Sequence, residues 1–314
     1  MRIVITGGAG FIGCNFIRYE LSHYVDDIIC IDSLTYAGSL DNLKDVKDNP
    51  KFTFVKADIT DKETIDSIFK EYKPDIVINF AAESHVDNSI QNPDLFTKIN
   101  VLGTQVLMDA CLKYGVKRFH QVSTDEVYGD LPLDTKDFFT ESSPLKPSSP
   151  YAASKASADL MVLAYVRTYG LNATITRSSN NYGPYQHSEK FIPVVINAIK
   201  NKKDIPVYGD GSNIRNWIYV ADNCIAIDLV VRKGERANIY NICSDTELSN
   251  LDLINIISKT MNMDAKIKFV QDRKGHDLRY SMLKDKIGNE LNWFPKFSFD
   301  EDIRKTVSWY LEKI

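Results

Sequence analysis

The sequence predicts an α/β fold in which a doubly wound parallel sheet is joined to a smaller, interleaved C-terminal domain. Short β-branched runs alternate with longer amphipathic stretches, a glycine-rich segment joins the first run to the first stretch, and the alternation stops near residue 178. Alternation of strands and helices typically builds a parallel sheet covered by helices on both faces. The irregular remainder indicates a second, smaller unit.

The expected elements follow one another closely along the chain. The strands are expected at 2–6, 28–31, 52–55, 76–80, 118–123 and 173–177. The helices between them are expected at 11–22, 62–72, 95–114 and 151–169. Farther on, a helix is expected at 191–201, and the segment WIYVADNCIAIDLVV predicts a strand end and a helix that return to the main sheet.

Composition argues against several classes of protein. The 314 residues are 44% hydrophobic and 25% charged with a net charge of -4, which gives no reason to expect nucleic acid or a membrane as partner. No apolar run approaches the roughly 18 residues of a membrane-spanning helix, and the first residues do not resemble a signal peptide. The cysteines form no CxxC pair and the five histidines do not cluster, so we expect buried thiols, a cytoplasmic location and no metal site.

A glycine-rich loop follows the first strand and opens the first helix. In ITGGAGFIG, the residues Gly7, Gly10 and Gly13 allow a tight turn, a close approach of backbone to a pyrophosphate, and close packing of helix on strand. The start of the helix presents free N–H groups to phosphate oxygens. The alternative is a glycine-rich turn without a ligand, but its place between strand and helix favours a dinucleotide.

An acidic residue ends the second strand, 19 residues after Gly13. Asp32 is placed to accept hydrogen bonds from the adenosine ribose, and no arginine lies between Arg18 and Arg118 to bind a 2′-phosphate. The sequence therefore predicts NAD rather than NADP as cofactor. The expected cofactor-binding residues are Gly7, Gly10, Phe11, Ile12, Gly13, Asp32, Ser33, Asp58, Ile59, Ala81, Ala82, Tyr151 and Lys155.

A tyrosine and a lysine four residues apart open the expected helix at 151–169. Tyr151 and Lys155 share one face of such a helix, where the ammonium group and a cationic nicotinamide ring would favour the phenolate. Tyr151 is therefore a candidate base. The same spacing recurs at Tyr280 and Lys284, which we interpret as surface residues because no cofactor motif is nearby.

Two adjacent carboxylates follow the fifth strand in the segment VSTDEVYG. Neighbouring side chains in a strand point to opposite faces, so Asp125 and Glu126 can serve one site only if the strand has ended before them. The alternative is an acid pair at a helix start, with Thr124 or Asp125 as the cap. Active sites in such sheets lie beyond the carboxyl ends of the strands, which is where these acids are expected.

Several segments together resemble the extended short-chain dehydrogenase/reductase family and, within it, the sugar-nucleotide dehydratases that act on dTDP-glucose. TGGAGFIG, STDEVYG and SSPYAASKASAD carry the resemblance, and it extends over most of the chain through AAESHVDNSI, SNNYGPYQHSEKFIP, PVYGDGSNIRNWIYV and DRKGHDLRY. Epimerases of this family usually carry small hydroxyl residues where this chain has Asp125 and Glu126. The resemblance thus implies a lyase that removes water, in deoxysugar synthesis and most often on the route to dTDP-rhamnose.

The resemblance also implies a mechanism with no net redox change. Tyr151 takes the proton of the glucose C4 hydroxyl while a hydride passes to NAD, Lys155 holds the ribose, and Thr124 bonds the C4 oxygen. Glu126 then removes the C5 proton, Asp125 protonates the departing C6 hydroxyl, and the hydride returns to C6. Opposite proton duties require that the pKa values of the two acids be split by repulsion and burial.

The substrate contacts are implied by the resemblance alone. They are Ser84, His85, Asn181, Lys190, Phe191, Tyr208, Arg215, Asn250, Arg273 and His276. The two arginines suit a diphosphate, because a guanidinium group binds phosphate oxygens bidentately. The chain departs from the family pattern at Asn79–Phe80, Asn88 and Lys274, and Asn88 leaves open whether a charge near the nucleotide is missing.

The resemblance assigns roles to the two domains. Residues 1–180 are expected to form the NAD-binding, Rossmann-like domain with a returning segment at about 217–236, and residues 181–314 to bind mainly the sugar nucleotide. Family members often dimerise through helices that correspond to 95–114 and 151–169, so a homodimer is expected. The alternatives are that these helices only cover the sheet, that the chain is an epimerase or a UDP-sugar dehydratase, or that it is a non-catalytic NAD-binding regulator.

Overall fold

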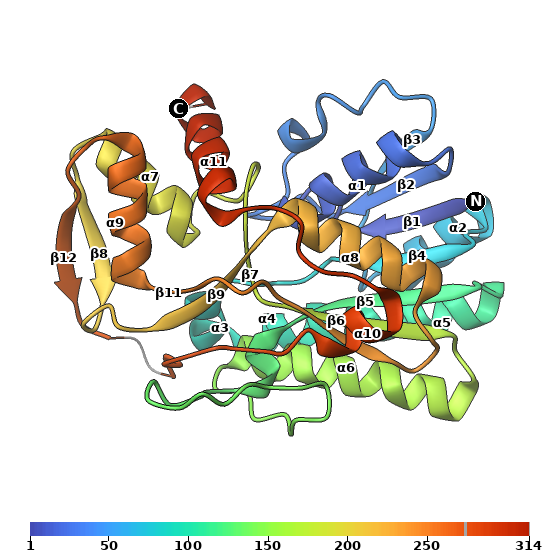
Figure 1. Cartoon of the computed structure of the whole chain (residues 1–314). Coiled ribbons are helices and arrows are strands. Elements are labelled where there is room, and N and C mark those ends of the chain that lie inside the picture. The colour runs from blue at the N-terminus through green and yellow to red at the C-terminus, as the bar shows by residue number, and fades with distance from the viewer. Residues whose placement is uncertain (273–274, 314) are drawn as a thin grey trace.

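The computed structural model describes residues 1–272 and 275–313. Its largest unit is a seven-stranded sheet with the order β10-β6-β5-β4-β1-β2-β3, in which every neighbouring pair is parallel (Figure 1). The predicted parallel sheet and its six expected strands are confirmed. The strands are β1 (Arg2–Thr6), β2 (Asp27–Asp32), β3 (Phe52–Lys56), β4 (Ile76–Asn79), β5 (Arg118–Thr124), β6 (Ala173–Ser178) and β10 (Ile239–Ile242).

The seventh strand comes from the second half of the chain. β10 pairs with β6 from Ile239 opposite Ile175 to Ile242 opposite Ser178, and it follows the helix α8 (Val220–Lys233). Its four residues do not show enough of a pattern to be recognised in the sequence. The structure therefore extends the returning part of the chain to at least Ile242, beyond the expected 217–236.

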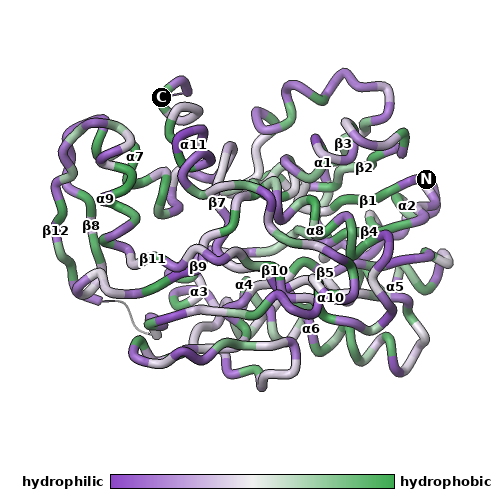
Figure 2. The backbone as a smooth tube through the Cα atoms, in the orientation of Figure 1, coloured by the Kyte–Doolittle hydropathy of each residue, from purple (hydrophilic) through white to green (hydrophobic). Residues whose placement is uncertain are grey.

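Helices cover both faces of the sheet because alternate strand residues enter two separate cores. Ile3 and Ile5 face α1 (Phe11–His23) and α8, whereas Val4 faces the opposite side. On that side the core is closed by α2 (Lys62–Tyr72), α5 (Thr104–Tyr114) and α6 (Pro150–Tyr169). Figure 2 shows the hydrophobic residues concentrated along the central strands. The doubly wound arrangement is thus built directly on the period-two alternation of each strand.

The stretch expected as one helix at 95–114 contains a π-helical segment. It is continuous from α4 (Pro93–Phe96) through η2 (Thr97–Gly103) into α5. Asn100 on η2 is buried, and its amide donates to the Glu83 carbonyl (3.0 Å) and to the Ser154 hydroxyl (2.8 Å). The wider π turn therefore accompanies a polar clamp that ties the loop after β4 to α6.

The second unit has its own apolar core, which includes Ile192, Val207, Leu253 and Val307. Two small sheets frame it, one with the order β11-β9-β7 and one with the order β12-β8. Further strands and α-helices are α3 (Val86–Gln91), β7 (Asn180–Tyr182), α7 (Phe191–Lys200), β8 (Asp204–Tyr208), β9 (Ile214–Tyr219), β11 (Glu247–Ser249), α9 (Asn250–Met261), β12 (Lys266–Val270), α10 (Asp285–Leu291) and α11 (Phe299–Lys313). The 3₁₀ helix η1 spans Leu40–Leu43.

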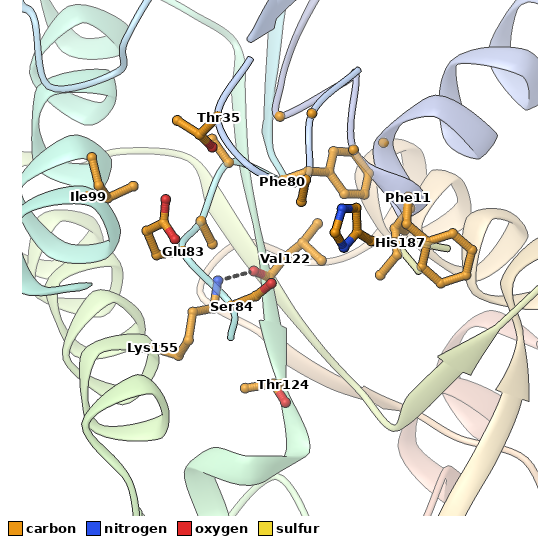
Figure 3. A pocket seen from close by; sticks show the side chains of 18 of the residues that line it. Phe11, Thr35, Phe80, Glu83, Ser84, Ile99, Val122, Thr124, Lys155 and His187 are labelled. Carbon is orange, nitrogen blue, oxygen red and sulfur yellow. Dashed lines mark hydrogen bonds between the residues drawn. The ribbon is translucent and has the colours of Figure 1, made fainter. Parts of the chain in front are cut away.

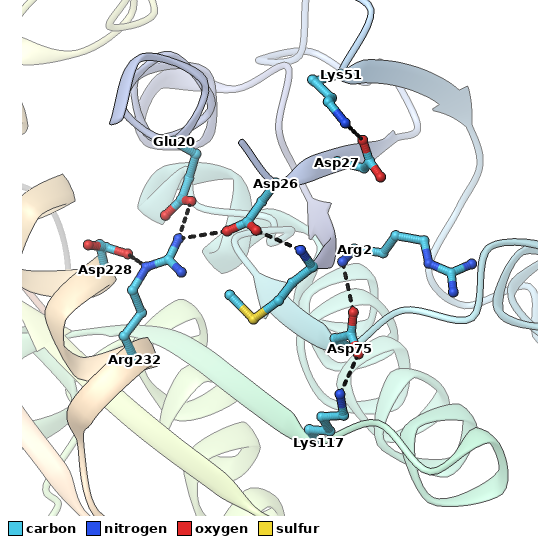
Figure 4. A network of polar contacts seen from close by, with 10 residues as sticks. Arg2, Glu20, Asp26, Asp27, Lys51, Asp75, Lys117, Asp228 and Arg232 are labelled. Carbon is cyan, nitrogen blue, oxygen red and sulfur yellow. Dashed lines mark hydrogen bonds and ion pairs between the residues drawn. The ribbon is translucent and has the colours of Figure 1, made fainter. Parts of the chain in front are cut away.

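A polar cluster ties α8 to the amino-terminal edge of the large sheet (Figure 4). The Arg232 guanidinium donates to Glu20 (2.6 Å), to Asp26 (3.1 Å) and to Asp228. Asp228 also accepts a hydrogen bond from the Tyr24 hydroxyl (2.7 Å). These contacts connect α1, the start of β2 and α8, so the returning helix is fixed by charge as well as by packing.

The five cysteines are Cys14, Cys30, Cys111, Cys224 and Cys243, and all are buried free thiols, as the sequence predicted. Within residues 1–272 and 275–313, none of the helices combines the length and the hydropathy needed to cross a bilayer.

Candidate active site

A cavity lies at the carboxyl ends of the parallel strands. Loops that follow β1, β2, β3, β4 and β5 contribute to its walls, together with α6 and the segment after β6. Figure 3 shows Thr124, Lys155, Glu83 and His187 arranged around it from different elements. A parallel sheet gathers the ends of all its strands at one edge, which is where ligand sites of such folds occur.

The glycine-rich loop at one wall is too crowded for side chains. Gly7 has a φ of +66°, and a Cβ atom on it would come within 2.6 Å of the Ala81 backbone nitrogen. Gly10 precedes α1 in an extended conformation, so the first N–H groups of this helix are exposed to the cavity wall. This cradle leaves room for the pyrophosphate of a dinucleotide against the backbone.

The Asp32 carboxylate is held by backbone groups on both sides. Its Oδ2 accepts from the Ala9 N–H (2.9 Å) and its Oδ1 from the Leu34 N–H (2.8 Å), while burial raises its pKa. The loop at 33–39 passes close to it, since a Cβ on Gly38 would lie 2.6 Å from Asp32 Oδ1. The carboxylate is thus fixed at the edge of the cavity with the geometry of a ribose acceptor.

The structure brings the expected cofactor-binding residues together. All thirteen line the cavity: Gly7, Gly10, Phe11, Ile12, Gly13, Asp32, Ser33, Asp58, Ile59, Ala81, Ala82, Tyr151 and Lys155. Sequence reasoning missed other lining residues, including Thr35, Tyr36, Glu83, Ile99, Ser178, Gln186 and His187. The segment 33–38 directly follows an expected strand end, so its position beside Asp32 was a usable signal. Within 178–187 the resemblance indicated only Asn181, because the other lining residues of this segment reach the site through tertiary packing.

Tyr151 and Lys155 lie one turn apart in the first half of α6. Lys155 is 4% exposed and its Nζ donates to the Val122 carbonyl (2.7 Å), as Figure 3 shows. Burial lowers the pKa of Lys155 to about 8, although the charge of Asp159 opposes this shift. Burial, followed by the negative charge of Glu126, raises the pKa of Tyr151 well above its usual value. The expected lowering of the Tyr151 pKa therefore requires the positive charge of a bound ligand, in addition to Lys155.

The acid pair is positioned by the end of β5. Thr124 caps the 3₁₀ helix η3 (Asp125–Tyr128), and its Oγ1 accepts from the Glu126 N–H (3.3 Å). The tight turn brings both carboxyl groups to the wall of one cavity. Both interpretations of the acid pair therefore hold: the pair begins a helix capped by Thr124, and Thr124 and both acids line the cavity.

Asp125 is the more deeply buried of the two acids. It is 2% exposed, and its Oδ1 accepts from the Thr124 hydroxyl (3.2 Å), whereas its Oδ2 has no hydrogen-bond partner among the described residues. Burial, followed by repulsion from Glu126, raises the pKa of Asp125 to about 8. The carboxyl group is therefore able to carry a proton at neutral pH and to donate it into the cavity.

Tyr280 is not a surface residue, and this interpretation of the sequence was wrong. Its side chain is 3% exposed, its hydroxyl donates to Asp277, and the Arg215 guanidinium lies 4.3 Å from its ring centre. The charge of Glu126 also contributes to raising the Tyr280 pKa, after burial. The ring is buried because the segment after 275 folds back onto β9, a tertiary contact that local sequence does not reveal.

The expected substrate residues form two groups. Ser84, Asn181 and Lys190 line the cavity, and Lys190 Nζ donates to the Ser84 carbonyl (3.1 Å). His85 lies nearby, with its Nε2 3.6 Å from Glu189. The structure thus places Ser84, Asn181 and Lys190 in the cavity lining, whereas His85, the residue after Ser84, is not part of the described lining.

The other expected substrate residues lie in the second unit and are not part of the described cavity lining. Arg215 donates to the carbonyls of Ile214 (2.8 Å) and Asp277 (2.9 Å), and His276 pairs with Asp272 (2.6 Å). The ring of Tyr208 lies 6.1 Å from that of His276, Asn250 begins α9, and Phe191 begins α7 against the second core. Arg273 lies outside the described residues.

The departures from the family pattern do not disturb the described site. Asn79 is fully buried, accepts from Thr6 (2.6 Å) and donates to Gln121 (2.9 Å) and Thr104 (3.1 Å), so its amide is satisfied. Phe80 lines the cavity, whereas the exposed Asn88 on α3 does not. Lys274 lies outside the described residues.

Comparison with known proteins agrees with this geometry. The family model described as GDP-mannose 4,6 dehydratase matches residues 4–306. The low-salt glycan biosynthesis protein Agl12 of Haloferax volcanii is 48% identical over 312 residues, and the match covers 99% of this chain and 99% of the relative. The dTDP-glucose 4,6-dehydratase of Haemophilus influenzae is 45% identical over 332 residues, covering 99% of this chain and 98% of the relative.

A solved structure is similar over the same range. The dTDP-glucose 4,6-dehydratase DesIV of Streptomyces venezuelae, crystallised with NAD and TYD, superposes with a TM-score of 0.96 and 46% identity. The match covers 99% of this chain and 97% of that chain.

Proposed function

Because the chain belongs to the GDP-mannose 4,6 dehydratase family, we propose that it converts dTDP-glucose to dTDP-4-keto-6-deoxyglucose with NAD as cofactor. The single observation that carries this proposal is the acid pair of the buried Asp125 and the half-buried Glu126, which lines one cavity together with Tyr151. The choice of nucleotide is supported by the relatives named dTDP-glucose 4,6-dehydratase, which match over almost their whole length. The product belongs to deoxysugar synthesis, with dTDP-rhamnose as the proposed end point.

The cavity residues fit a dinucleotide. The loop of Gly7, Gly10 and Gly13 would hold the pyrophosphate, Asp32 the adenosine ribose, and Lys155 the nicotinamide ribose. We also propose Asp58 as a contact of the adenine. Bound NAD would supply a hydride acceptor for C4 of the sugar and later a hydride donor for C6.

Two side chains act at the C4 hydroxyl group. We propose that Tyr151 Oη takes the proton of the C4 hydroxyl and that Thr124 Oγ1 donates a hydrogen bond to the C4 oxygen. Without a ligand, the pKa of Tyr151 is raised by burial and by Glu126, so Tyr151 becomes a base only when positive charge accompanies the substrate. This arrangement restricts proton abstraction to the loaded site.

The acid pair carries out the elimination. Asp125, whose pKa is about 8, enters the reaction protonated and delivers its proton to the C6 oxygen as water leaves. The half-buried Glu126 removes the C5 proton, which the neighbouring 4-keto group has acidified, and later returns a proton there. Asp125 is buried and Glu126 is partly exposed, and this difference assigns proton donation to Asp125 and proton removal to Glu126.

The sugar nucleotide is proposed to span both groups of expected residues. Ser84, His85, Asn181 and Lys190 would surround the sugar, and Arg215, Arg273 and His276, with Phe191, Tyr208 and Asn250, would contact the nucleotide. Two N–H groups of Arg215 already donate to the Asp277 and Ile214 carbonyls, so its binding of a diphosphate would require these contacts to exchange.

The domain roles, the assembly and the location belong to the same proposal. Residues 1–180 with the returning segment bind NAD, and 181–314 bind mainly the sugar nucleotide. Leu102 on η2 and Leu160 on α6 are 39% and 57% exposed, and Ala164 is exposed as well, which supports a homodimer formed through these helices. Val106 is buried against the sheet and does not belong to that face. Five buried free thiols agree with a cytoplasmic enzyme.

The deciding experiment is turnover in heavy water. Purified protein with dTDP-glucose should yield a product that has lost water and gained one deuterium at C5, without net consumption of NAD. Conversion of UDP-glucose instead would change the nucleotide, and C4 inversion without loss of water would show an epimerase. A protein that binds NAD but turns over neither sugar nucleotide would be a non-catalytic regulator, and this result would overturn the proposal. In that case the Tyr151→Phe variant should bind NAD as the unaltered protein does and should likewise show no turnover.

A further inference from the structure

Behind Lys155 lies a buried ion pair that the proposed mechanism does not use. Asp159 is fully buried one turn further along α6, and its Oδ2 accepts from Arg177 Nε on β6 (2.9 Å). Arg177 is only 2% exposed, and its guanidinium also lies 4.8 Å from the ring centre of Tyr128. A buried guanidinium cannot lose its proton, so it requires a carboxylate in the ionised form.

Only part of Asp159 is used by Arg177. Its Oδ1 is buried, and the buried Ser123 hydroxyl lies close enough to act on the same carboxyl group. Burial raises the pKa of Asp159, and the charges of Arg177 and Lys155, followed by the hydrogen bonds of Arg177 and Ser123, oppose this shift. Ser123 follows Val122, whose carbonyl accepts the hydrogen bond from Lys155 Nζ. Asp159, Lys155 and the end of β5 therefore form one small buried polar region, of which Lys155 and Ser123 line the cavity.

Among the described residues, Asp159 is the acid whose charge opposes the effect of burial on Lys155. In a buried site, an amine without a nearby anion loses its proton, because burial disfavours the charged form. The carbonyl of Val122 stabilises an N–H donor whether the amine is charged or neutral. The residue four positions away on a helix is close in space, and here it is an acid.

We propose that Asp159 is a positioning residue whose fixed negative charge keeps Lys155 protonated, while Arg177 keeps Asp159 ionised. This inference rests on the proposed function, in which a charged Lys155 holds the ribose and favours the Tyr151 phenolate. The chain of charges runs from Arg177 on β6 through Asp159 to Lys155 on α6, and it enters the cavity at Tyr151.

Among the described residues, other titratable groups near this pair include some on α6 and some on η3. Tyr151 lies on α6 itself, and Asp125, Glu126 and Tyr128 lie on η3. The charge of Asp159 acts on Lys155 in the direction opposite to burial, which leaves the pKa of Lys155 at about 8. Removal of that charge should therefore lower it further, toward a neutral amine at the pH of the cell.

The test follows Lys155 directly by NMR on the cofactor-free full chain labelled with ¹³Cε-lysine. The Lys155 signal is the one that disappears in a Lys155→Met variant. Its titration midpoint should fall by at least about one pH unit in Asp159→Asn. The Asp159→Asn/Arg177→Met variant leaves no unpaired buried guanidinium, so it should fold even if the single variant does not, and it should show the same fall.

Asp302→Asn is the matched control, since Asp302 is a fully buried acid on α11 that is paired with Lys305 instead. It should leave the Lys155 midpoint unchanged. An unchanged midpoint in the folded double variant would overturn the proposal.

A second readout separates this proposal from the proposed function. In the turnover assay, the alkaline limb of kcat/KM should move to lower pH in the Asp159 variants by about the shift seen by NMR. If the unaltered protein turns over no sugar nucleotide, the proposed function fails although the NMR result stands. A lower kcat/KM with an unmoved alkaline limb and an unmoved midpoint would assign Asp159 a purely structural role.

Discussion

Two groups of buried carboxylates lie at opposite ends of the strands of the large sheet, and they differ in how many of their oxygens accept hydrogen bonds. At the amino-terminal edge, Glu20, Asp26 and Asp228 each accept a hydrogen bond from Arg232 (Figure 4). At the carboxyl-terminal edge, Asp125 receives one hydrogen bond from Thr124, and its second oxygen has no partner among the described residues.

The difference shows how the chain separates stability from chemistry. Asp26 and Asp228 have both carboxylate oxygens occupied, so they stabilise the packing of α1 against α8 but cannot easily exchange a proton with a ligand. A buried carboxyl group with an open oxygen is costly for the folded state, yet it can donate a proton when a substrate arrives. If the second oxygen of Asp125 were occupied, proton donation would be reduced. If the three carboxylates around Arg232 lost their hydrogen bonds, stability would be reduced.

The largest expected effect tests the open edge. Asp125→Asn should lower kcat by about 10²- to 10⁴-fold, because an amide cannot deliver the proton to the leaving oxygen. The midpoint of urea unfolding should not decrease, since the variant removes a poorly satisfied acid. Steady-state kinetics and urea titration check both parts, with the exposed Asp134→Asn as control. A stable, fully active Asp125→Asn protein would contradict the assigned role.

The second effect tests the occupied edge. Arg232→Met leaves three carboxylates without their shared guanidinium, so the free energy of unfolding should fall by about 3 kcal/mol. The kcat/KM per folded molecule should remain unchanged, because the cluster does not line the cavity. The exposed neighbour Lys233 supplies the control variant Lys233→Met, which should change the free energy of unfolding by less than about 0.5 kcal/mol. Equal losses of unfolding free energy in Arg232→Met and Lys233→Met would show that the cluster stabilises the protein no more than an exposed charge does.

The smallest effect concerns pH. Burial and Glu126 raise the pKa of Asp125 from 3.8 to about 8, so the folded protein holds a proton that the unfolded chain has released. This contribution to stability is present at low pH and is lost as the pH rises toward about 8.

Asp125→Asn lacks this dependence. The difference in the free energy of unfolding, variant minus unaltered protein, should therefore increase by at least about 1 kcal/mol between about pH 5 and about pH 8. Urea titrations at several pH values measure the gap. A gap that stays flat would mean that Asp125 is already ionised in the folded protein.

The sequence was informative where function depends on contiguous residues. The glycine loop, Asp32 and the pair Tyr151–Lys155 are each part of a short motif at a strand end or a helix start, and parallel topology alone brings them to one cavity. Six strands could be predicted because their alternate residues enter two cores.

The sequence was less informative where position depends on distant contacts. The π turn around Asn100 does not interrupt the helical pattern, and β10 is too short to recognise before β6 is known to lie beside it. Tyr280 was misinterpreted because its burial depends on Arg215, 65 positions earlier in the chain.

The place of β10 at the edge of the large sheet has a consequence for synthesis on the ribosome. The sheet begins with residue 2 but is not complete until residues near 242 have left the exit tunnel. Until then the outer edge of β6 and the face awaiting α8 are exposed, which favours binding by chaperones and pairing between nascent chains. A fragment cut near residue 180 should for the same reason be recovered mainly as aggregate rather than as an independent nucleotide-binding domain.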